Sequence, residues 1–387
     1  MSVFDKDQTY IANTYSRFPV ELVRGKGSRL VGSDGKEYID LGSGIAVNAF
    51  GVGDEVWKQA VVKQLDTLPH ASNLYYTSPM AELAEMLCAK TGMKKVFFGN
   101  SGAEANECAI KTARKWALDT YGEGHSTIIT LKNSFHGRTI ATISATGQDS
   151  FHTNFGPFTP GFVYAEPNDI ESVKALSEET PCAAVMLECV QGEGGVVALD
   201  ADFLKGVEKL CHEKGMLLVV DEVQTGNGRC GALYSYMRFG LAPDIVTTAK
   251  GLGGGLPIGA CIMGEKVKDT LTPGTHGSTF GGNPVSCAGA VSILERLDDA
   301  LMEDVRKKSD YIVGALTGAP GVKSVTGLGL MLGVEPANKP AKEVIAKCIE
   351  GGVLLLSAKT KVRLLPPLTI PWDDLKKAVD VLKEALK

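Results

Sequence analysis

Two short apolar runs in the middle of the chain each end near a residue that could carry out chemistry. Residues 217–220 lead directly into Asp221, and residues 245–248 lead to Lys250, which has glycines immediately behind it. Short runs rich in leucine, isoleucine and valine are typical of buried parallel strands. Ligands of an open α/β sheet bind beyond the carboxyl ends of its strands. We therefore expect Asp221 and Lys250 to reach the same crevice.

A buried acid and a buried lysine in one crevice favour a particular chemistry. A lysine in a desolvated pocket loses its proton readily and becomes a nucleophile that can form a Schiff base. An acid beside a pyridine nitrogen keeps that nitrogen protonated, and the ring then acts as an electron sink. Lys250 and Asp221 are thus the two anchors that an enzyme dependent on pyridoxal 5'-phosphate (PLP) needs. Taken alone, the pair could also be structural, with Asp221 capping a helix and Lys250 in solvent.

The length and composition are those of an ordinary globular protein. The 387 residues are enough for two domains, with 44% hydrophobic and 22% charged residues. A net charge of −5 and a pI near 5.8 give no basic surface for nucleic acid or an anionic membrane. No apolar run approaches the roughly 20 residues that span a bilayer. The first ten residues lack the basic start and apolar core of a secretion signal.

The cysteines indicate a reducing compartment. The chain has nine, an odd number, and none belongs to a CxxC pair or a Cys/His cluster. Small buried hydrophobic residues explain them better than disulfides or metal ligands do. We therefore expect a cytoplasmic protein without a metal site, and no nucleic acid or membrane among its partners.

Apolar periodicity predicts strands and helices that alternate along most of the chain. A hairpin is expected from residues 29–31 and 38–41. Further strands are expected at residues 95–98, 127–131, 183–188, 217–220, 245–248, 353–356 and 362–365. Helices are expected at residues 54–68, 79–90, about 102–116, 201–214, 285–297, 302–316, 342–350 and 372–386. Such alternation favours an α/β fold, with a mainly parallel sheet flanked by helices on both faces.

A glycine-rich segment at residues 274–283 is typical of a hinge or a domain boundary. We expect an N-terminal arm with small strands over residues 1–50, which packs with the C-terminal domain. A large cofactor-binding domain is expected over residues 51–277, and a smaller α+β domain over residues 278–387.

The segment from Gly99 to Glu104 has the pattern of a phosphate-binding turn. A predicted strand precedes it and a predicted helix follows it. The free amide groups and the positive dipole end of a helix N-terminus attract an anion. Ser101 and Glu104 also form a capping box, so the turn could serve only to start the helix.

One motif favours a different cofactor. Residues 226–231, GNGRCG, match the GxGxxG pattern of dinucleotide-binding proteins and follow a predicted strand. In a true fingerprint the strand runs almost straight into the first glycine, whereas Asp221, Glu222 and Gln224 intervene here. Two acids at the strand end would also repel a pyrophosphate. A nicotinamide-dependent dehydrogenase therefore stays a remote alternative, and no P-loop, zincin or serine-hydrolase motif occurs.

Seven further segments follow one another along nearly the whole chain. They are SGAEANE (101–107), FHGRT (135–139), ECVQGEGG (188–195), DEVQTGNGRCG (221–231), TTAKGLGGGLPIGA (247–260), HGSTFGGNP (276–284) and KVRLLPP (361–367). Together they resemble the class III, ornithine-type, PLP-dependent aminotransferases, and residues 25–47 are most similar to the acetylornithine aminotransferase branch. The resemblance implies the PLP-dependent transferase fold of type I.

The resemblance also implies a role for each matching cofactor residue. Lys250 would form the Schiff base and later move the α-proton, and Asp221 would hold the pyridine N–H. Because one matching residue would contact the phosphate of the partner subunit, a homodimer with shared active sites is implied. The other positions are Ser101, Gly102 and Ala103 for the phosphate, Phe135 for the ring face, Gln224 for the ring hydroxyl, Glu188 for the cofactor side of the pocket and Thr279 for the partner's phosphate.

Five further residues are implied to bind substrate. Arg138 and Arg363 resemble the carboxylate clamps of the family, because a guanidinium binds a carboxylate bidentately. Arg363 lies in an apolar strand, where an unpaired charge would be costly. Glu193 resembles a switch residue that pairs with one arginine while the amino donor binds and releases it for the second carboxylate of glutamate. Ser278 and Tyr15 match positions that face the substrate.

Two departures from the family pattern bear on the substrate. Ile45 stands where ornithine δ-aminotransferases carry a tyrosine near the ring, which favours a donor with a blocked α-amino group. The usual GHxHP is here residues 51–55, GVGDE, in which Asp54 is available as a helix N-cap.

The sequence therefore predicts a ping-pong aminotransferase that uses PLP. The δ-amino group of N2-acetylornithine would pass to 2-oxoglutarate, which gives N-acetylglutamate 5-semialdehyde and glutamate, as in arginine biosynthesis. Within the family, succinyl-diaminopimelate, succinylornithine, ornithine, 4-aminobutyrate and lysine-carrier substrates stay open. A cofactor-binding regulator without turnover is a third class, which would keep the lysine but would not need Glu193 and the paired arginines.

Overall fold

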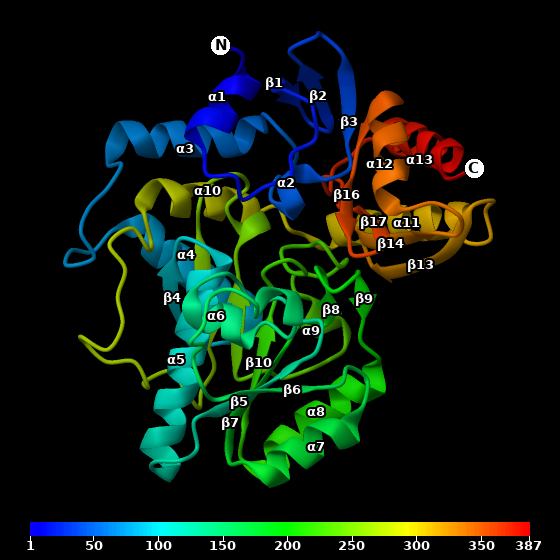
Figure 1. Ribbon diagram of the computed structural model, residues 1–387. Coiled ribbons are helices and arrows are strands. Elements are labelled where there is room, and N and C mark those ends of the chain that lie inside the picture. Colours follow the sequence, from blue (N-terminus) through cyan, green and yellow to red (C-terminus); the bar gives the residue numbers. More distant parts are fainter.

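A seven-stranded sheet lies at the centre of the larger part of the computed structural model, which describes residues 1–387 (Figure 1). β12 runs antiparallel to both of its neighbours, and all other pairs are parallel. The sheet is thus mainly parallel, as predicted. In spatial order its strands are β4 (Lys95–Gly99), β12 (Gly259–Met263), β11 (Ile245–Thr248), β10 (Leu217–Asp221), β7 (Cys182–Leu187), β5 (Thr127–Leu131) and β6 (Phe162–Ala165).

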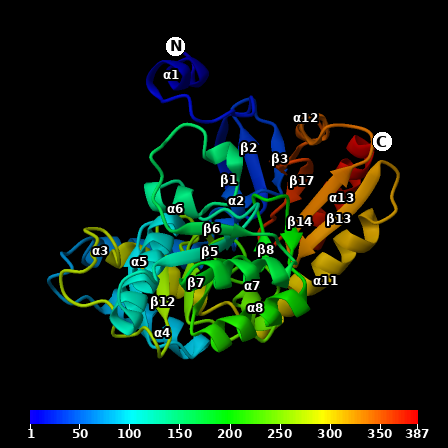
Figure 2. The ribbon, with the colours of Figure 1, turned by 60° about the horizontal axis from the view of Figure 1, so that its bottom comes forward.

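Both faces of this sheet are covered, because its strands are apolar at successive positions. In β10, Leu217 and Val219 share an apolar cluster with residues of α5 (Gly102–Tyr121). Leu218 and Val220 point the other way and share a cluster with residues of α8 (Ala201–Lys214). α7 (Ile170–Glu179) lies beside α8 (Figure 2). All of β10 is buried, which explains why its sequence is continuously apolar rather than alternating.

Three helices pack together beside the edge strand β4. They are α3 (Glu55–Thr67), α4 (Ser78–Thr91) and α10 (Pro284–Leu294). Asp54 begins α3 by accepting a hydrogen bond from the Trp57 amide at 2.8 Å, and it also pairs with Arg296. None of the helices in the structure combines the length and the apolar composition that crossing a membrane requires.

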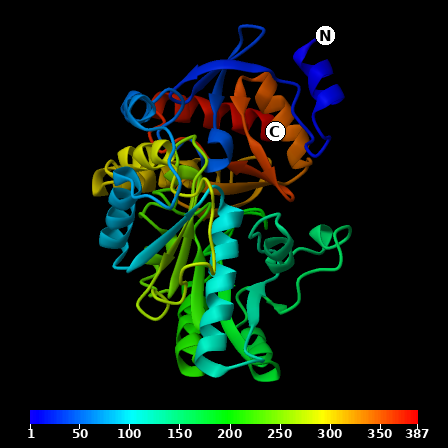
Figure 3. The same cartoon turned by 90° about the vertical axis from the view of Figure 1, so that its left-hand side faces the viewer.

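The smaller part of the molecule contains segments from both ends of the chain (Figures 1 and 3). β3 (Glu37–Asp40) pairs with β15 (Val353–Leu354), so a C-terminal strand completes the N-terminal sheet formed with β1 (Leu22–Lys26) and β2 (Arg29–Gly32). A second sheet has the order β13 (Val322–Leu328), β14 (Met331–Pro336), β17 (Lys361–Leu364) and β16 (Leu356–Ala358). Its helices are α11 (Asp299–Leu316), α12 (Ala341–Glu350) and α13 (Trp372–Leu386). α1 (Val3–Tyr10) projects from this part and buries none of its residues.

Several elements differ from their predicted bounds. α5 runs to Tyr121 rather than to residue 116, and α11 starts at Asp299 rather than at residue 302. The expected strand 353–356 is divided between two sheets as β15 and β16. The domain division at residues 50 and 277 stays a prediction. α10, which lies beyond residue 277, packs on α3 and α4.

Candidate active site

A cavity of about 460 Å³ opens at the carboxyl ends of the parallel strands. The register of β10 and β11 sets Asp221 level with Thr247, so that Lys250 emerges just beyond the end of β11. Both side chains line the cavity, as the positions of the two apolar runs predicted. The shared crevice follows directly from the parallel register, because the strands deliver their carboxyl ends to one edge.

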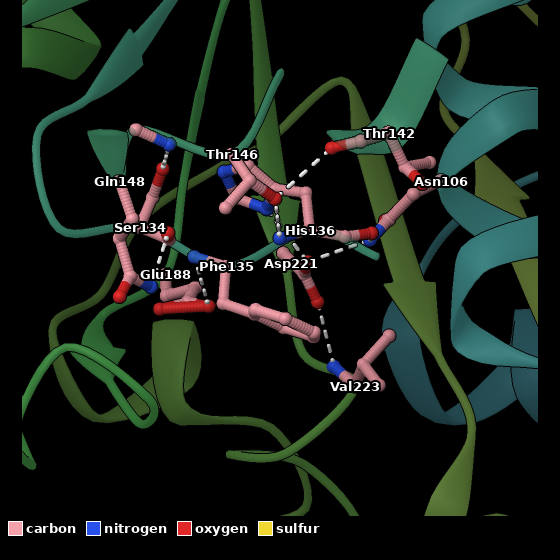
Figure 4. A network of polar contacts seen from close by, with 11 residues as sticks. Asn106, Ser134, Phe135, His136, Thr142, Thr146, Gln148, Glu188, Asp221 and Val223 are labelled. Carbon is pink, nitrogen blue, oxygen red and sulfur yellow. Dashed lines mark hydrogen bonds and ion pairs between the residues drawn. The ribbon is translucent and has the colours of Figure 1, made fainter. Parts of the chain in front are cut away.

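Asp221 is fixed by donors from three parts of the chain (Figure 4). Its Oδ2 accepts hydrogen bonds from Asn106 Nδ2 at 2.7 Å and from His136 Nδ1 at 2.8 Å. Its Oδ1 accepts one from the Val223 amide at 3.0 Å. The side chain is 3% exposed, and hydrogen bonds of this kind stabilise a carboxylate in a buried place. The arrangement leaves Oδ1 able to accept a further donor from the cavity.

Lys250 combines backbone strain with partial burial. Its φ is +47°, a left-handed conformation that non-glycine residues rarely adopt. Burial lowers the pKa of the Lys250 amine, although the nearby carboxylates of Glu193 and Asp221 oppose this shift. A lowered pKa makes the neutral, nucleophilic amine more accessible. The residue is therefore prepared for attack on a carbonyl carbon.

The N-terminus of α5 forms one side of the cavity. Ser101 is the N-cap, and its Oγ accepts a hydrogen bond from the Glu104 amide at 3.1 Å. The first amides of a helix have no partner within the helix, so those of Gly102 and Ala103 are available to an anion. A Cβ on Gly102 would lie 2.5 Å from the Val223 side chain, so only glycine lets this helix start approach the strand end of β10.

Aromatic rings and an arginine line another side. Phe135, which follows β5, lines the cavity and contacts the ring of Phe151, with centroids 5.7 Å apart. The Arg138 guanidinium lies over both rings, 5.6 Å from the centroid of Phe135 and 4.7 Å from that of Phe151. Stacking of this kind holds the charge near the cavity without neutralising it. Arg138 thus remains available to an anionic ligand.

Arg363, Glu193 and Gln224 form a separate polar group next to the cavity. Arg363 lies on β17 and is 3% exposed. Its Nη1 donates to Glu193 Oε1 and, at 3.1 Å, to Gln224 Oε1, and Gln224 Nε2 donates to Glu193 Oε1 at 3.3 Å. Burial raises the pKa of Glu193, but the charge and hydrogen bond of Arg363 outweigh this, and the pKa lies below its usual value. The two side chains are therefore an ion pair.

Three residues that were expected at the site do not line this chain's own cavity. Tyr15 is 68% exposed and lies under the Arg17 guanidinium. Ser278 accepts hydrogen bonds from the Gly281 amide at 2.9 Å and from Asn100 Nδ2 at 3.3 Å. Thr279 is exposed on the surface. Their roles remain predictions, and for Thr279 an exposed position is what a contact with a partner subunit requires.

The GxGxxG segment does not form a dinucleotide site. Residues 226–231 fold into a series of turns, and no helix begins directly behind them. Arg229 in this segment is buried and donates to the carbonyl oxygens of Leu330 and Pro366. The segment therefore joins the two parts of the molecule, and the arrangement of strand, glycine turn and helix that a pyrophosphate needs is missing here.

Three residues of the site were not singled out from the sequence. Asn106 and His136 orient Asp221, and Val223 forms an apolar wall. The spacing of Asn106 with Ala109, Ala113 and Ala117 places it on the buried face of α5, which was a usable signal. His136 lies inside the FHGRT segment, but nothing local indicates its partner, which is 85 residues away.

Comparison with known proteins assigns this site to a family. The model of the family "Aminotransferase class-III" matches residues 10–386. The chain belongs to the class-III aminotransferases. Among curated members, it is 50% identical over 381 residues to an acetylornithine aminotransferase of Haemophilus ducreyi, covering 98% of this chain and 97% of that protein. It is 46% identical to the acetylornithine aminotransferase of Aquifex aeolicus, covering 98% and 100%.

Solved class-III aminotransferases share the whole fold. An ornithine aminotransferase from Toxoplasma gondii superposes with a TM-score of 0.95 at 32% identity, covering 99% of this chain and 94% of that one. An N-acetylornithine aminotransferase from Stenotrophomonas maltophilia gives a TM-score of 0.85 at 34% identity, covering 99% and 98%. The expected family and fold class are confirmed.

Proposed function

We propose that this class-III aminotransferase uses PLP to move the δ-amino group of N2-acetylornithine to 2-oxoglutarate. The observation that carries the proposal is the shared cavity, in which half-buried Lys250 and buried Asp221 lie with the N-terminus of α5. The names of the relatives support this substrate, since acetylornithine aminotransferases align with 98% of this chain at 46–50% identity. The products are N-acetylglutamate 5-semialdehyde and glutamate, which places the reaction in arginine biosynthesis.

The residues fit PLP in charge and in position. The free amides of Gly102 and Ala103 at a helix N-terminus suit a phosphate, and the apolar walls of Phe135 and Val223 suit a flat ring. Asp221 can accept a hydrogen bond from a protonated pyridine nitrogen. When bound, PLP supplies a carbonyl carbon for amines and an electron-withdrawing ring.

The side chains of this chain then carry out the proton movements. Lys250 Nζ is the group that would hold PLP through its carbonyl carbon, and it would be free again once a donor amine took its place. The free Nζ would act as the base that takes the proton from the carbon bearing the donor's amino group and as the acid that gives a proton back. Asn106, His136 and the Val223 amide all donate to Asp221 and fix its orientation. Asp221 would hold the pyridine nitrogen of PLP.

Arg138 and Arg363 bind the two substrates according to where each substrate carries a carboxylate. The reacting end of acetylornithine carries no carboxylate, so Arg363 keeps its ion pair with Glu193 while this donor binds. The reacting end of 2-oxoglutarate carries a carboxylate, which replaces Glu193 on Arg363. Arg138 binds the carboxylate at the far end of either substrate. One pocket thereby accepts both molecules in turn.

The choice of acetylornithine over other ω-amines depends on the wall near residue 45. Ile45 is 42% exposed and precedes Val47, which lines the cavity, by two residues. Both side chains are apolar, whereas free ornithine would bring a second ammonium group. Burying an unpaired ammonium is costly, so a donor whose α-amine is acylated is favoured. Ornithine, succinylornithine, succinyl-diaminopimelate and 4-aminobutyrate are the alternatives within the family.

A second copy of the chain is the proposed partner. Leu74, Tyr75 and Tyr76 are 87%, 70% and 104% exposed, and Phe280 is 60% exposed. The two loops form one surface, because Asn73 Nδ2 donates to the carbonyl oxygens of Ser278 and Gly281 at 2.9 and 2.8 Å. Apolar side chains exposed together mark an interface. A symmetric dimer through this surface would carry Thr279 towards the partner's cavity.

A cytoplasmic location stays part of the proposal. All nine cysteines are free, and eight of them are buried. Free cysteines are typical of a reducing compartment.

The two half-reactions test the proposed function. Purified PLP-loaded enzyme is mixed with N2-acetylornithine alone, and the visible absorbance is recorded. We expect the absorbance of the lysine-bound cofactor to disappear and to return when 2-oxoglutarate is added. Ornithine and 4-aminobutyrate, tested in the same way, measure the selectivity. An unchanged spectrum with every ω-amine would contradict the proposal. Reduction of a nicotinamide by the enzyme would instead favour a dehydrogenase function.

A further inference from the structure

Glu188 is a buried acid that takes no part in the proton transfers described above. It directly follows β7, lines the cavity and is 8% exposed. Its Oε1 accepts a hydrogen bond from the Phe135 amide at 3.3 Å, as Figure 4 shows. Its Oε2 is buried and has no partner within the chain. A buried polar atom without a partner costs free energy, so Oε2 is placed for a ligand.

The groups around Glu188 favour its neutral form. Burial raises the pKa of Glu188 well above its usual value, and the negative charge of Asp221 raises it further. Glu193 acts in the same direction, whereas Lys250 and the Phe135 amide act against it. His136, which lies close to both acids, already gives its Nδ1 hydrogen to Asp221. A carboxylic acid that stays neutral in a buried site can donate a hydrogen bond.

The strand order determines which side of the cofactor Glu188 faces. In a PLP ring, the carbon that Lys250 attacks is opposite the nitrogen, and the phosphate arm and the phenolic oxygen flank that carbon on opposite sides. Asp221 holds the nitrogen at the end of β10. The phosphate site at the start of α5 follows β4, on one side of β10, and Glu188 follows β7, on the other side. The phenolic oxygen therefore points towards Glu188.

Gln224, the residue expected at that oxygen, is partly engaged elsewhere. Its Oε1 accepts from Arg363 and its Nε2 donates to Glu193. Only the second Nε2 hydrogen remains for the cofactor. By contrast, the whole of Glu188 Oε2 is free, and because Oε1 is already an acceptor, a proton on this carboxyl belongs on Oε2.

We propose that Glu188 is a protonated acid whose Oε2 donates a hydrogen bond to the phenolic oxygen of bound PLP. The inference rests on the proposed cofactor chemistry and assigns one more positioning residue to it. The donor stabilises negative charge on that oxygen. This negative charge is largest after the nitrogen that links Lys250 to the ring has lost its proton. The hydrogen bond from Glu188 therefore lowers the pH at which that nitrogen loses its proton.

A pH titration of the visible absorbance of the PLP-loaded enzyme measures this midpoint without turnover. Glu188→Leu removes the donor, and we expect the midpoint to rise by about one pH unit. Glu188→Gln keeps the shape, the neutrality and an N–H donor, and we expect a midpoint within about 0.3 pH unit of the wild type. In infrared difference spectra the wild-type enzyme should show the C=O stretch of a protonated carboxylic acid, which Glu188→Gln removes.

If Glu188 were ionised, the midpoint of the titration would shift in the opposite direction on substitution. An ionised Glu188 would stabilise the protonated link, so Glu188→Gln would lower the midpoint by about one pH unit or more. That result, or the absence of the acid C=O stretch, overturns the assignment of Glu188. Since Glu188→Gln is isosteric, the test holds even where Glu188→Leu fails to fold. If the wild-type enzyme forms no visible band with PLP, the proposed cofactor use fails as well, which is a distinguishable outcome.

Discussion

At the scale of single residues, the site depends on the hydrogen bonds that fix the orientation of its charged side chains. Asp221 is buried, yet its oxygens accept hydrogen bonds from a helix side chain, a loop histidine and the amide of its own turn. A carboxylate held in this way can face a ring nitrogen without rotating. His136 is itself packed, since its side chain is fully buried. The geometry at the nitrogen is thus determined by the residues that donate to Asp221.

Asn106→Ala tests this support. The change removes the hydrogen bonds of Asn106 Nδ2 to Asp221 and to the carbonyl oxygen of His136. We expect kcat/KM to fall about 10- to 100-fold and the free energy of unfolding to fall by about 1–3 kcal/mol. Steady-state kinetics and urea unfolding measure the two effects. Asn338→Ala, at an exposed asparagine without side-chain hydrogen bonds, is the control and should change neither.

Glu193→Gln tests whether Arg363 pairs with Glu193 for one substrate and with a substrate carboxylate for the other. Without the carboxylate, the guanidinium of Arg363 is left buried and unpaired while a donor with no carboxylate at its reacting end binds. We expect kcat/KM for the acetylornithine half-reaction to fall about 10-fold or more, and that for 2-oxoglutarate to stay within about 3-fold. Stopped-flow absorbance separates the two. An equal loss in both half-reactions would contradict the switch.

The control for this ion pair lies on the surface. Lys209 and Glu213 on α8 are 3.7 Å apart and largely exposed. Exposed pairs contribute little, so Glu213→Gln should leave both half-reactions and the stability unchanged.

At the scale of elements, the start of α5 is the most constrained part of the site. Gly102→Ala would place a methyl group 2.5 Å from Val223 and push that side chain into the space for the ring. We expect PLP to bind about 10-fold more weakly, measured by equilibrium dialysis of the apoenzyme. The helix itself should tolerate alanine well, because alanine favours helices more than glycine does.

Gly314→Ala provides the matched control for that substitution. Gly314 lies inside α11, where an added Cβ has no neighbour within 4 Å. We expect PLP affinity to stay the same and the free energy of unfolding to rise by about 0.5–1 kcal/mol. If Gly102→Ala behaved like Gly314→Ala, the close approach of α5 to Val223 would have no role in the site.

The elements that could be predicted are those with strong apolar patterns. β10 and β11 are continuously apolar, and α13 places Leu375, Val379 and Leu382 on one buried face. Two elements that were not predicted are α7 and β12. α7 has ten residues, of which only Val173 is buried. β12 follows a run of glycines and a proline, and its GACIM sequence does not resemble an isolated strand, although neighbours on both sides pair with it.

At the scale of the whole molecule, the site is only partly readable from the sequence. Strand ends predicted that Asp221 and Lys250 meet, because a parallel sheet brings such positions together. The contact of Asp221 with Asn106 spans 115 residues, and no local pattern encodes it. The same holds for the group of Arg363 with Gln224, which joins the two parts of the molecule across 139 residues. Such contacts depend on the tertiary fold.

The dimer is tested at this scale. Tyr76→Asp places a charge in the middle of the exposed apolar loops 74–76 and 280. Burying an unpaired charge in an interface is costly, so we expect monomers at micromolar concentration and at least a 10-fold loss of activity. Sedimentation velocity measures the assembly. Leu118→Glu, at a 53% exposed position near the far end of α5, should remain dimeric and active. A monomeric, fully active Tyr76→Asp enzyme would show that each cavity is complete within one chain.

The pairing of β3 with β15 has a consequence for how the protein is made. While the chain leaves the ribosome, strands β1, β2 and β3 emerge first, but the strand that covers the edge of β3 begins only at Val353. Throughout that interval the nascent hairpin presents unpaired backbone groups. The large sheet, by contrast, has all its strands once Met263 has emerged. Synthesis therefore favours completion of the catalytic half first, with the two ends of the polypeptide joining last.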